Sequence, residues 1–125
     1  MNDQTIEQEI QAKFLTAPRV TPADIEANIF SEHYFMARDG VRGADPRTFK
    51  NVDTYESGPI LHVSLGLLTF CVLVLKNGFT VTGESACASP ENFDAELGRK
   101  IARDNAVSKV WPLMGYALKD RLSKD

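Results

Sequence analysis

Three cationic residues, Arg99, Lys100 and Arg103, lie close together in a segment with helical spacing. On a helix they would share one sector, and such groups can hold the phosphate or carboxylate of a ligand. The alternative is an ordinary solvated face, because Glu96 and Asp104 stand at spacings that let them neutralise part of this charge. This segment is the first place where the chain could bind an anion.

Arg38, Arg42 and Arg47 bring further positive charge to residues 39–59 and to the start of that segment. The segment is rich in Gly and Asp and has no readable apolar period, which predicts a long loop or flap. Loops of this length often carry binding residues. We therefore expect that a nucleotide-sized anion could be clamped between the flap and the cationic helix.

Polar residues at two other points could complete such a site. His33 and Tyr34 could grip a ligand, or act as a general acid and its orienting partner, while packing is the alternative role for Tyr34. Ser85 lies shortly before the helix that Ser89 and Pro90 are expected to start, and a helix N-terminus can hold a phosphate. The expected ligand-binding residues are Arg99, Lys100, Arg103, His33, Tyr34, Ser85 and Arg42.

The sequence contains no catalytic motif. His33 and His62 are far apart, and no cysteine pair with metal-ligand spacing accompanies them. Cys71 and Cys87 are too few for a disulfide framework, so we expect reduced thiols. These absences favour a protein that is not an enzyme and that needs neither a metal nor a cofactor.

The composition is that of an ordinary globular chain. Its 125 residues are 43% hydrophobic and 25% charged, with a formal net charge of -3, which predicts a single folded domain over residues 1–125. The negative balance argues against general nucleic-acid binding. The longest apolar run, Leu65 to Leu75, is about half of a membrane span and no signal-peptide pattern precedes it, so we expect a cytoplasmic protein without a membrane partner.

Asn77 and Gly78 stand between two β-prone runs and predict a hairpin. This hairpin and its neighbouring elements must position the residues that could do chemistry. A two-residue type I′ turn would pair Lys76 with Phe79 and Val74 with Val81. One face would then carry Phe70, Val72, Val74, Phe79 and Val81, while Cys71, Leu73 and Leu75 make the other face of the first strand apolar too. Because a two-stranded ribbon cannot cover both faces, we expect helices on one side and a second copy on the other, in a homo-oligomer that is a dimer or a dimer of dimers.

Two helices are expected before the hairpin. An apolar stripe predicts the first helix over residues 2–15. Thr21 and Pro22 predict the start of a second helix, which we expect to run to Tyr34 or Phe35. Residues 60–65 are compatible with a third short strand.

The segment after the hairpin also has helical signals. Ser89 and Pro90 predict a helix start, and Pro112 predicts a kink or a restart farther along. The expected fold class is therefore α+β, with two N-terminal helices, a central antiparallel hairpin and a C-terminal helical segment.

Three strings resemble a family of short proteins from tailed bacteriophages and prophages: SEHYF at residues 31–35, TFCVLVLKNGFTVTGESA at residues 69–86 and WPLMGY at residues 111–116. The resemblance implies a phage origin and a shared fold, and it carries no established activity. By analogy with accessory phage proteins it implies a role in the host cytoplasm. The role would be that of an oligomeric binder that sequesters a small phosphorylated ligand, such as a nucleotide defence signal. The alternative is a protein-interaction module that inhibits or modulates a host protein.

Overall fold

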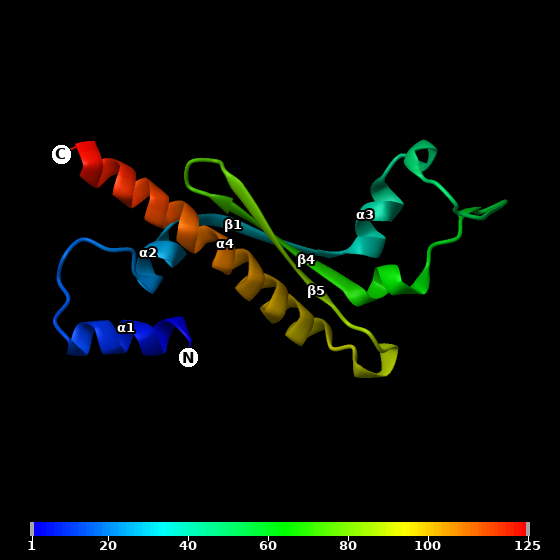
Figure 1. Ribbon diagram of the computed structural model, residues 1–125. Helices are drawn as coiled ribbons and strands as arrows, with labels where there is room; N and C mark the ends of the chain where they lie inside the picture. Colours follow the sequence, from blue (N-terminus) through cyan, green and yellow to red (C-terminus); the bar gives the residue numbers. More distant parts are fainter. Residues whose placement is uncertain (1, 125) are drawn as a thin grey trace.

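A three-stranded antiparallel sheet and one long helix form the centre of the computed structural model, which describes residues 2–124 (Figure 1). The strands are β1 (Ile29–Met36), β4 (Leu68–Leu75) and β5 (Thr80–Ala86), in the order β1-β4-β5, so β4 lies in the middle. Helix α4 (Ala95–Lys124) crosses one face of this sheet. The predicted α+β class is confirmed.

The core lies between α4 and the sheet face that it covers. Alternate residues of β4 are buried, and Val81 of β5 joins them: Thr69, Cys71, Leu73, Leu75 and Val81. The buried residues of α4 recur at every fourth position and so form one ridge of the helix: Gly98, Ala102, Ala106 and Val110. Most of these are small, and β5 carries Gly83 where a Cβ would collide with the backbone of Ala102 and Ala106.

The hairpin turn has three residues, not the two that the type I′ prediction requires. The N–H of Gly78 donates to the carbonyl oxygen of Leu75 at 2.8 Å. The N–H of Leu75 donates to the carbonyl oxygen of Phe79, also at 2.8 Å. Gly78 alone in the turn has a positive φ, of 90°, which is typical of a type I turn followed by a glycine bulge. The predicted pairing of Lys76 with Phe79 is therefore wrong.

The register of β5 shifts by one residue as a result. Val74 lies opposite Thr80 and Leu73 lies opposite Val81, so the predicted pairing of Val74 with Val81 is wrong. A shift of one residue turns every side chain of a strand to the other face. Val81 therefore faces α4 and does not share a face with Phe70, and the other face of β5 carries Thr80, Thr82 and Glu84.

The second predicted helix is too long. Helix α2 (Pro22–Ala27) starts at Pro22 as expected, with a capping box between Thr21 and Asp24, but it ends at Ala27 and the chain continues as β1. The bulky residues of Ile29–Met36 fit either a helix or a strand, and pairing with the free edge of β4 decides for the strand. The third strand is thus β1, and the strand expected at residues 60–65 is not formed.

The segment predicted as a flap contains short elements of its own. Helix α3 (Ala37–Gly43) follows β1 directly, and then come η1 (Pro46–Thr48), a small hairpin of β2 (Thr54–Tyr55) and β3 (Gly58–Pro59), and η2 (Val63–Leu67). We refer to residues 37–67 as the side lobe. In Figure 1 it extends from the end of the sheet that lies farthest from α1.

The C-terminal segment forms one helix after a short 3-10 turn. Ser89 precedes η3 (Pro90–Asn92), and α4 itself begins at Ala95, where Asp94 Oδ1 accepts from the N–H of Leu97 at 3.0 Å. The helix start is therefore later than Ser89 and Pro90 predict. Pro112 lies inside α4 without ending or restarting it. Over residues 2–124 no helix is long and apolar enough to cross a membrane.

Helix α1 (Asp3–Ala12) is shorter than predicted and has no buried residue. Two polar contacts attach it to the rest of the chain. The indole Nε1–H of Trp111 donates to Asp3 at 2.9 Å, and the Arg19 guanidinium pairs with Glu7 at 2.6 Å. The N-terminal helix is thus an accessory to the core.

The close approach of α4 to β5 can be tested by Gly83→Ala. The added methyl would overlap the α4 backbone, so we expect the free energy of unfolding to fall by about 1–3 kcal/mol, measured by urea denaturation. Gly115→Ala is the matched control, because an added Cβ there meets no atom within 4 Å and should stabilise the helix by about 0.5–1 kcal/mol. Equal stability of the two variants would contradict the packing described.

Candidate functional site

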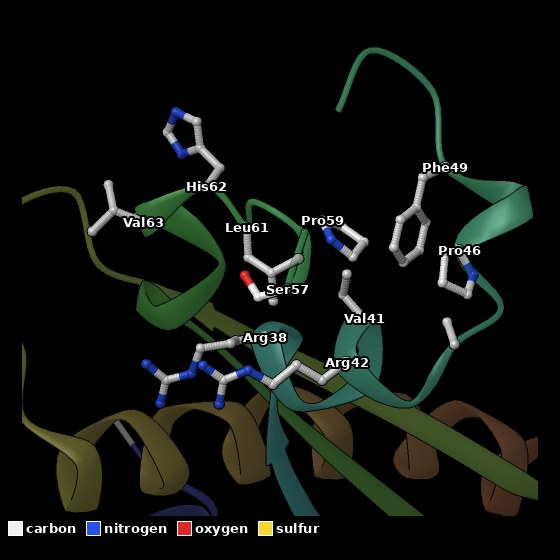
Figure 2. A pocket seen from close by; sticks show the side chains of 11 residues that line it. Arg38, Val41, Arg42, Pro46, Phe49, Ser57, Pro59, Leu61, His62 and Val63 are labelled. Atoms are coloured by element: carbon white, nitrogen blue, oxygen red, sulfur yellow. The ribbon is translucent and has the colours of Figure 1, made fainter. Parts of the chain in front are cut away.

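The side lobe forms an open cavity of about 600 Å³ between α3 and the segment that leads into η2 (Figure 2), and Arg38, Arg42 and His62 at its walls are exposed. Its walls come from parts of the chain about twenty residues apart. Arg38, Val41 and Arg42 belong to α3, Phe49 follows η1, and the opposite wall carries Ser57, Pro59, Leu61, His62 and Val63. The short helix and the small hairpin together position this site.

Arg38 and Arg42 give the cavity its charge. They stand four residues apart on α3, which places them on the same side of that helix, and both side chains extend in the same direction in Figure 2. Within residues 2–124 neither guanidinium has a carboxylate at ion-pair distance, and no Asp or Glu lines the cavity. Arg47, by contrast, pairs with Asp45 at 2.9 Å.

Two further contacts restrict the groups around the cavity. Arg38 lies against η2, because a Cβ added at Gly66 would stand 3.3 Å from its Nη1. His62 Nδ1 accepts a hydrogen bond from the N–H of Ser64 at 3.1 Å. The proton of the neutral imidazole therefore sits on Nε2, which makes that atom a donor.

Arg103, unlike Arg38 and Arg42, is held in ion pairs with other elements of the fold. Its guanidinium pairs with Glu26 of α2 at 2.7 Å and with Glu32 of β1 at 2.8 Å, and Tyr34 Oη donates to Glu32 at 2.6 Å. The bonds from Arg103, and then from Tyr34, hold the pKa of Glu32 below its usual value. Burial and the neighbouring Glu32 raise the pKa of Tyr34 well above its usual value. Two carboxylates thus neutralise the one guanidinium, and the cluster ties α2, β1 and α4 together.

The remaining predicted site residues lie on three different elements: His33 on β1, Ser85 on β5, and Arg99 and Lys100 on α4. His33 faces away from α4, with its Nε2 3.0 Å from the hydroxyl oxygen of Ser31. Ser85 lines a small space near the start of α4, and Lys100 pairs with Glu96 at 3.3 Å on the exposed side of α4. Of the seven residues, Arg42 alone lines the side-lobe cavity, and neither Arg99 nor Lys100 does, so the expected clamp between flap and cationic helix is not formed.

Sequence reasoning missed the far wall of the cavity. The positive charge of Arg38 and Arg42 was visible in and before the predicted flap, but Leu61 and His62 stand about twenty residues later in a segment without a clear period. Only the folded path of the side lobe brings them opposite α3. Over the described residues 2–124, no group of three or more His, Cys, Asp or Glu is placed to hold a metal ion.

The Arg103 cluster predicts a pH-dependent contribution to stability. Glu32→Gln removes one charge, and we expect it to lower the free energy of unfolding at about pH 7 by about 1–2 kcal/mol. The folded-state pKa of Glu32 is lowered from its ordinary value of 4.5. The stabilisation by the Glu32 carboxylate is therefore fully present above the ordinary pKa, and it is lost as the pH falls through the folded-state pKa. Urea denaturation at about pH 7 and about pH 3 should show the difference from wild type shrinking.

Glu96→Gln is the control for that experiment. Its Lys100 partner is well exposed, so this pair should contribute little at either pH. A difference between wild type and Glu32→Gln that is the same at both pH values would contradict the role given to the cluster.

Comparison with known proteins supports the phage resemblance. The model of one protein family matches residues 20–122, which include every strand of the central sheet, the side lobe and α4 except Ser123 and Lys124. Neither the curated proteins nor the solved structures contain a significant match. The chain therefore belongs to the phage protein (N4 Gp49/phage Sf6 gene 66) family.

Proposed function

We propose that this phage protein is a non-enzymatic binder of a small phosphorylated ligand, held in the side-lobe cavity. The observation that carries the proposal is the pair Arg38 and Arg42, which line the cavity and have no carboxylate at ion-pair distance among residues 2–124. A guanidinium presents parallel N–H donors that match the oxygens of a phosphate. In a chain with a net charge of -3, such a local excess of positive charge needs a specific reason.

The size of the cavity favours an organic anion. Its volume of about 600 Å³ lies within the range usual for small-molecule sites, and inorganic phosphate would fill only a small part of it. Phe49 offers an aromatic face, and the Nε2–H of His62 offers a further donor. A nucleotide combines a phosphate with a flat ring and suits this set of groups.

Sequestration of a ligand requires only that the protein binds it. A phage protein that holds a nucleotide defence signal in the host cytoplasm would lower the free signal without any chemical step. The free concentration then depends on the affinity and on the amount of protein made. We propose counter-defence of this kind as the role in infection.

A second copy of the chain is proposed as the cover of the open face, by which we mean the sheet face turned away from α4. Phe35 and Phe70 stack there with ring centroids 5.3 Å apart, and Val72 and Val74 continue the apolar surface along β4. In Figure 1 no helix crosses this face. Closed symmetry is the commonest arrangement of soluble homo-oligomers, which favours a dimer or a dimer of dimers.

The open face also favours a second function, that of a module that binds a host protein. An uncovered aromatic and β-branched surface is suited to a protein partner as well as to a second copy. A pull-down from host lysate separates the two. Recovery of one stoichiometric host protein that is lost with Val72→Glu would favour this function over ligand sequestration.

The ligand site is tested by calorimetry with a panel of linear and cyclic nucleotides. We expect the double variant Arg38→Gln/Arg42→Gln to lose at least about tenfold in affinity for any member that binds. The matched control is Arg99→Gln/Lys100→Gln, which removes two cations from α4 and should leave the affinity unchanged. Loss in the control alone would move the site to α4, and no heat from any nucleotide would reject the proposal.

The oligomer is tested by light scattering at micromolar concentration. For the wild type we expect the mass of a dimer or a tetramer of the 13.9 kDa chain. For Val72→Glu we expect a shift toward the monomer mass, because a charge at the centre of the open face would be buried without a partner. Phe14→Ser is the control, since Phe14 is 83% exposed and lies outside the sheet. A monomer mass for the wild type would refute this proposal.

A further inference from the structure

A second cavity, of about 490 Å³, adjoins the first within the side lobe. The two share Val41, Phe49, Leu61 and His62, so these side chains form a common wall. Beyond that wall the second cavity is lined by further apolar residues. They are Val52, Ile60 and Leu65.

The side lobe has no packed interior of its own. Over residues 37–67 only Ala37 is buried, while Val41, Phe49, Leu61 and Leu65 are half-buried. Val52 is 38% exposed and Ile60 is 45% exposed. The lobe therefore presents apolar surface that no other part of residues 2–124 covers, and covering such surface is favourable in water.

The charges of the two cavities differ. Arg38 and Arg42 line only the first cavity, and no Asp or Glu of the described residues lines that cavity. The second cavity has Lys50 and Asp53 at its edge, so its formal charges balance, and its other lining is mostly apolar. One end of the combined space thus favours an anion and the other favours an uncharged apolar group.

We infer that the two cavities form one site for an amphipathic organic phosphate. Its phosphate would lie on Arg38 and Arg42, and its aromatic or apolar body would pass Phe49 and Leu61 to reach Val52 and Ile60. This inference rests on the proposed anion site and adds the class of ligand that it selects. Binding of the body would also give the lobe the packed interior that it lacks.

Calorimetry on the full chain with simple probes separates the two claims. We expect 1-naphthyl phosphate to bind at least about tenfold more tightly than inorganic phosphate, because only the former buries apolar surface. We expect 2-naphthol, which has the ring without the phosphate, to bind more weakly than 1-naphthyl phosphate. Equal affinity for the two phosphates would overturn the inference while leaving the anion site intact, and no binding of either would overturn both.

Variants of the second cavity test where the ring lies. Val52→Thr/Ile60→Thr should remove most of the preference for the naphthyl group and leave the affinity for inorganic phosphate unchanged. The matched control is Leu113→Thr/Leu122→Thr, since these two residues of α4 are 38% and 43% exposed, and it should keep the full preference. An unchanged preference in the cavity variant would place the ring elsewhere.

A measurement on the unaltered protein keeps the inference testable if the cavity variant fails to fold. Nuclear Overhauser effects between the naphthyl protons and the methyl groups of Val52, Ile60 and Leu61 are expected in the complex. Effects only to methyl groups outside the side lobe would overturn the assignment.

Discussion

The contact between α4 and β5 is the constraint on which the rest of the fold depends. Gly83 has no Cβ, and the buried ridge of α4 opposite it consists mainly of glycine and alanine, so backbone meets backbone. This brings the helix close enough to bury alternate residues of β4. A three-stranded sheet with one such helix has one covered face and one open face, and both the core and the proposed interface follow from that asymmetry.

Two regions depend on this core in different ways. The Arg103 cluster joins α2 and β1 to α4 through charges that are already paired, so it serves to fix the elements. The side lobe leaves the end of the sheet and contributes almost nothing to the core, yet it carries unpaired arginines and uncovered apolar side chains. Uncovered apolar surface of this kind is commonly a binding surface.

Part of this structure could be predicted from the sequence. The hairpin, the helix start at Thr21 and Pro22 and the α+β class follow from local patterns, and the structure confirms them. The register could not be derived, because Asn-Gly suits both a two-residue turn and a three-residue turn with glycine at the bulge. Strand β1 was missed for a different reason: its spacing of bulky residues also fits a helix, and only the edge of β4 decides between them.

The candidate site was predictable only in its charged half. The positive charge of Arg38 and Arg42 and its place near residues 39–59 are visible in the sequence. Helix α3 and the return of the chain at Leu61 and His62 are not, because they depend on packing within an irregular lobe. The pairing of Arg103 was not predictable either, since the sequence does not show that Glu26 and Glu32 reach it from other elements.

The central claim is that Arg38 and Arg42 hold the phosphate of a ligand. Its most direct test is a titration of the wild-type protein with a nucleotide, followed by the arginine Nε–Hε resonances in a ¹H–¹⁵N spectrum. We predict saturable shifts of the Arg38 and Arg42 resonances, with the Arg103 resonance unchanged because Glu26 and Glu32 already bind it. Saturable shifts at Arg99 or Arg103 without any at Arg38 and Arg42 would contradict the claim.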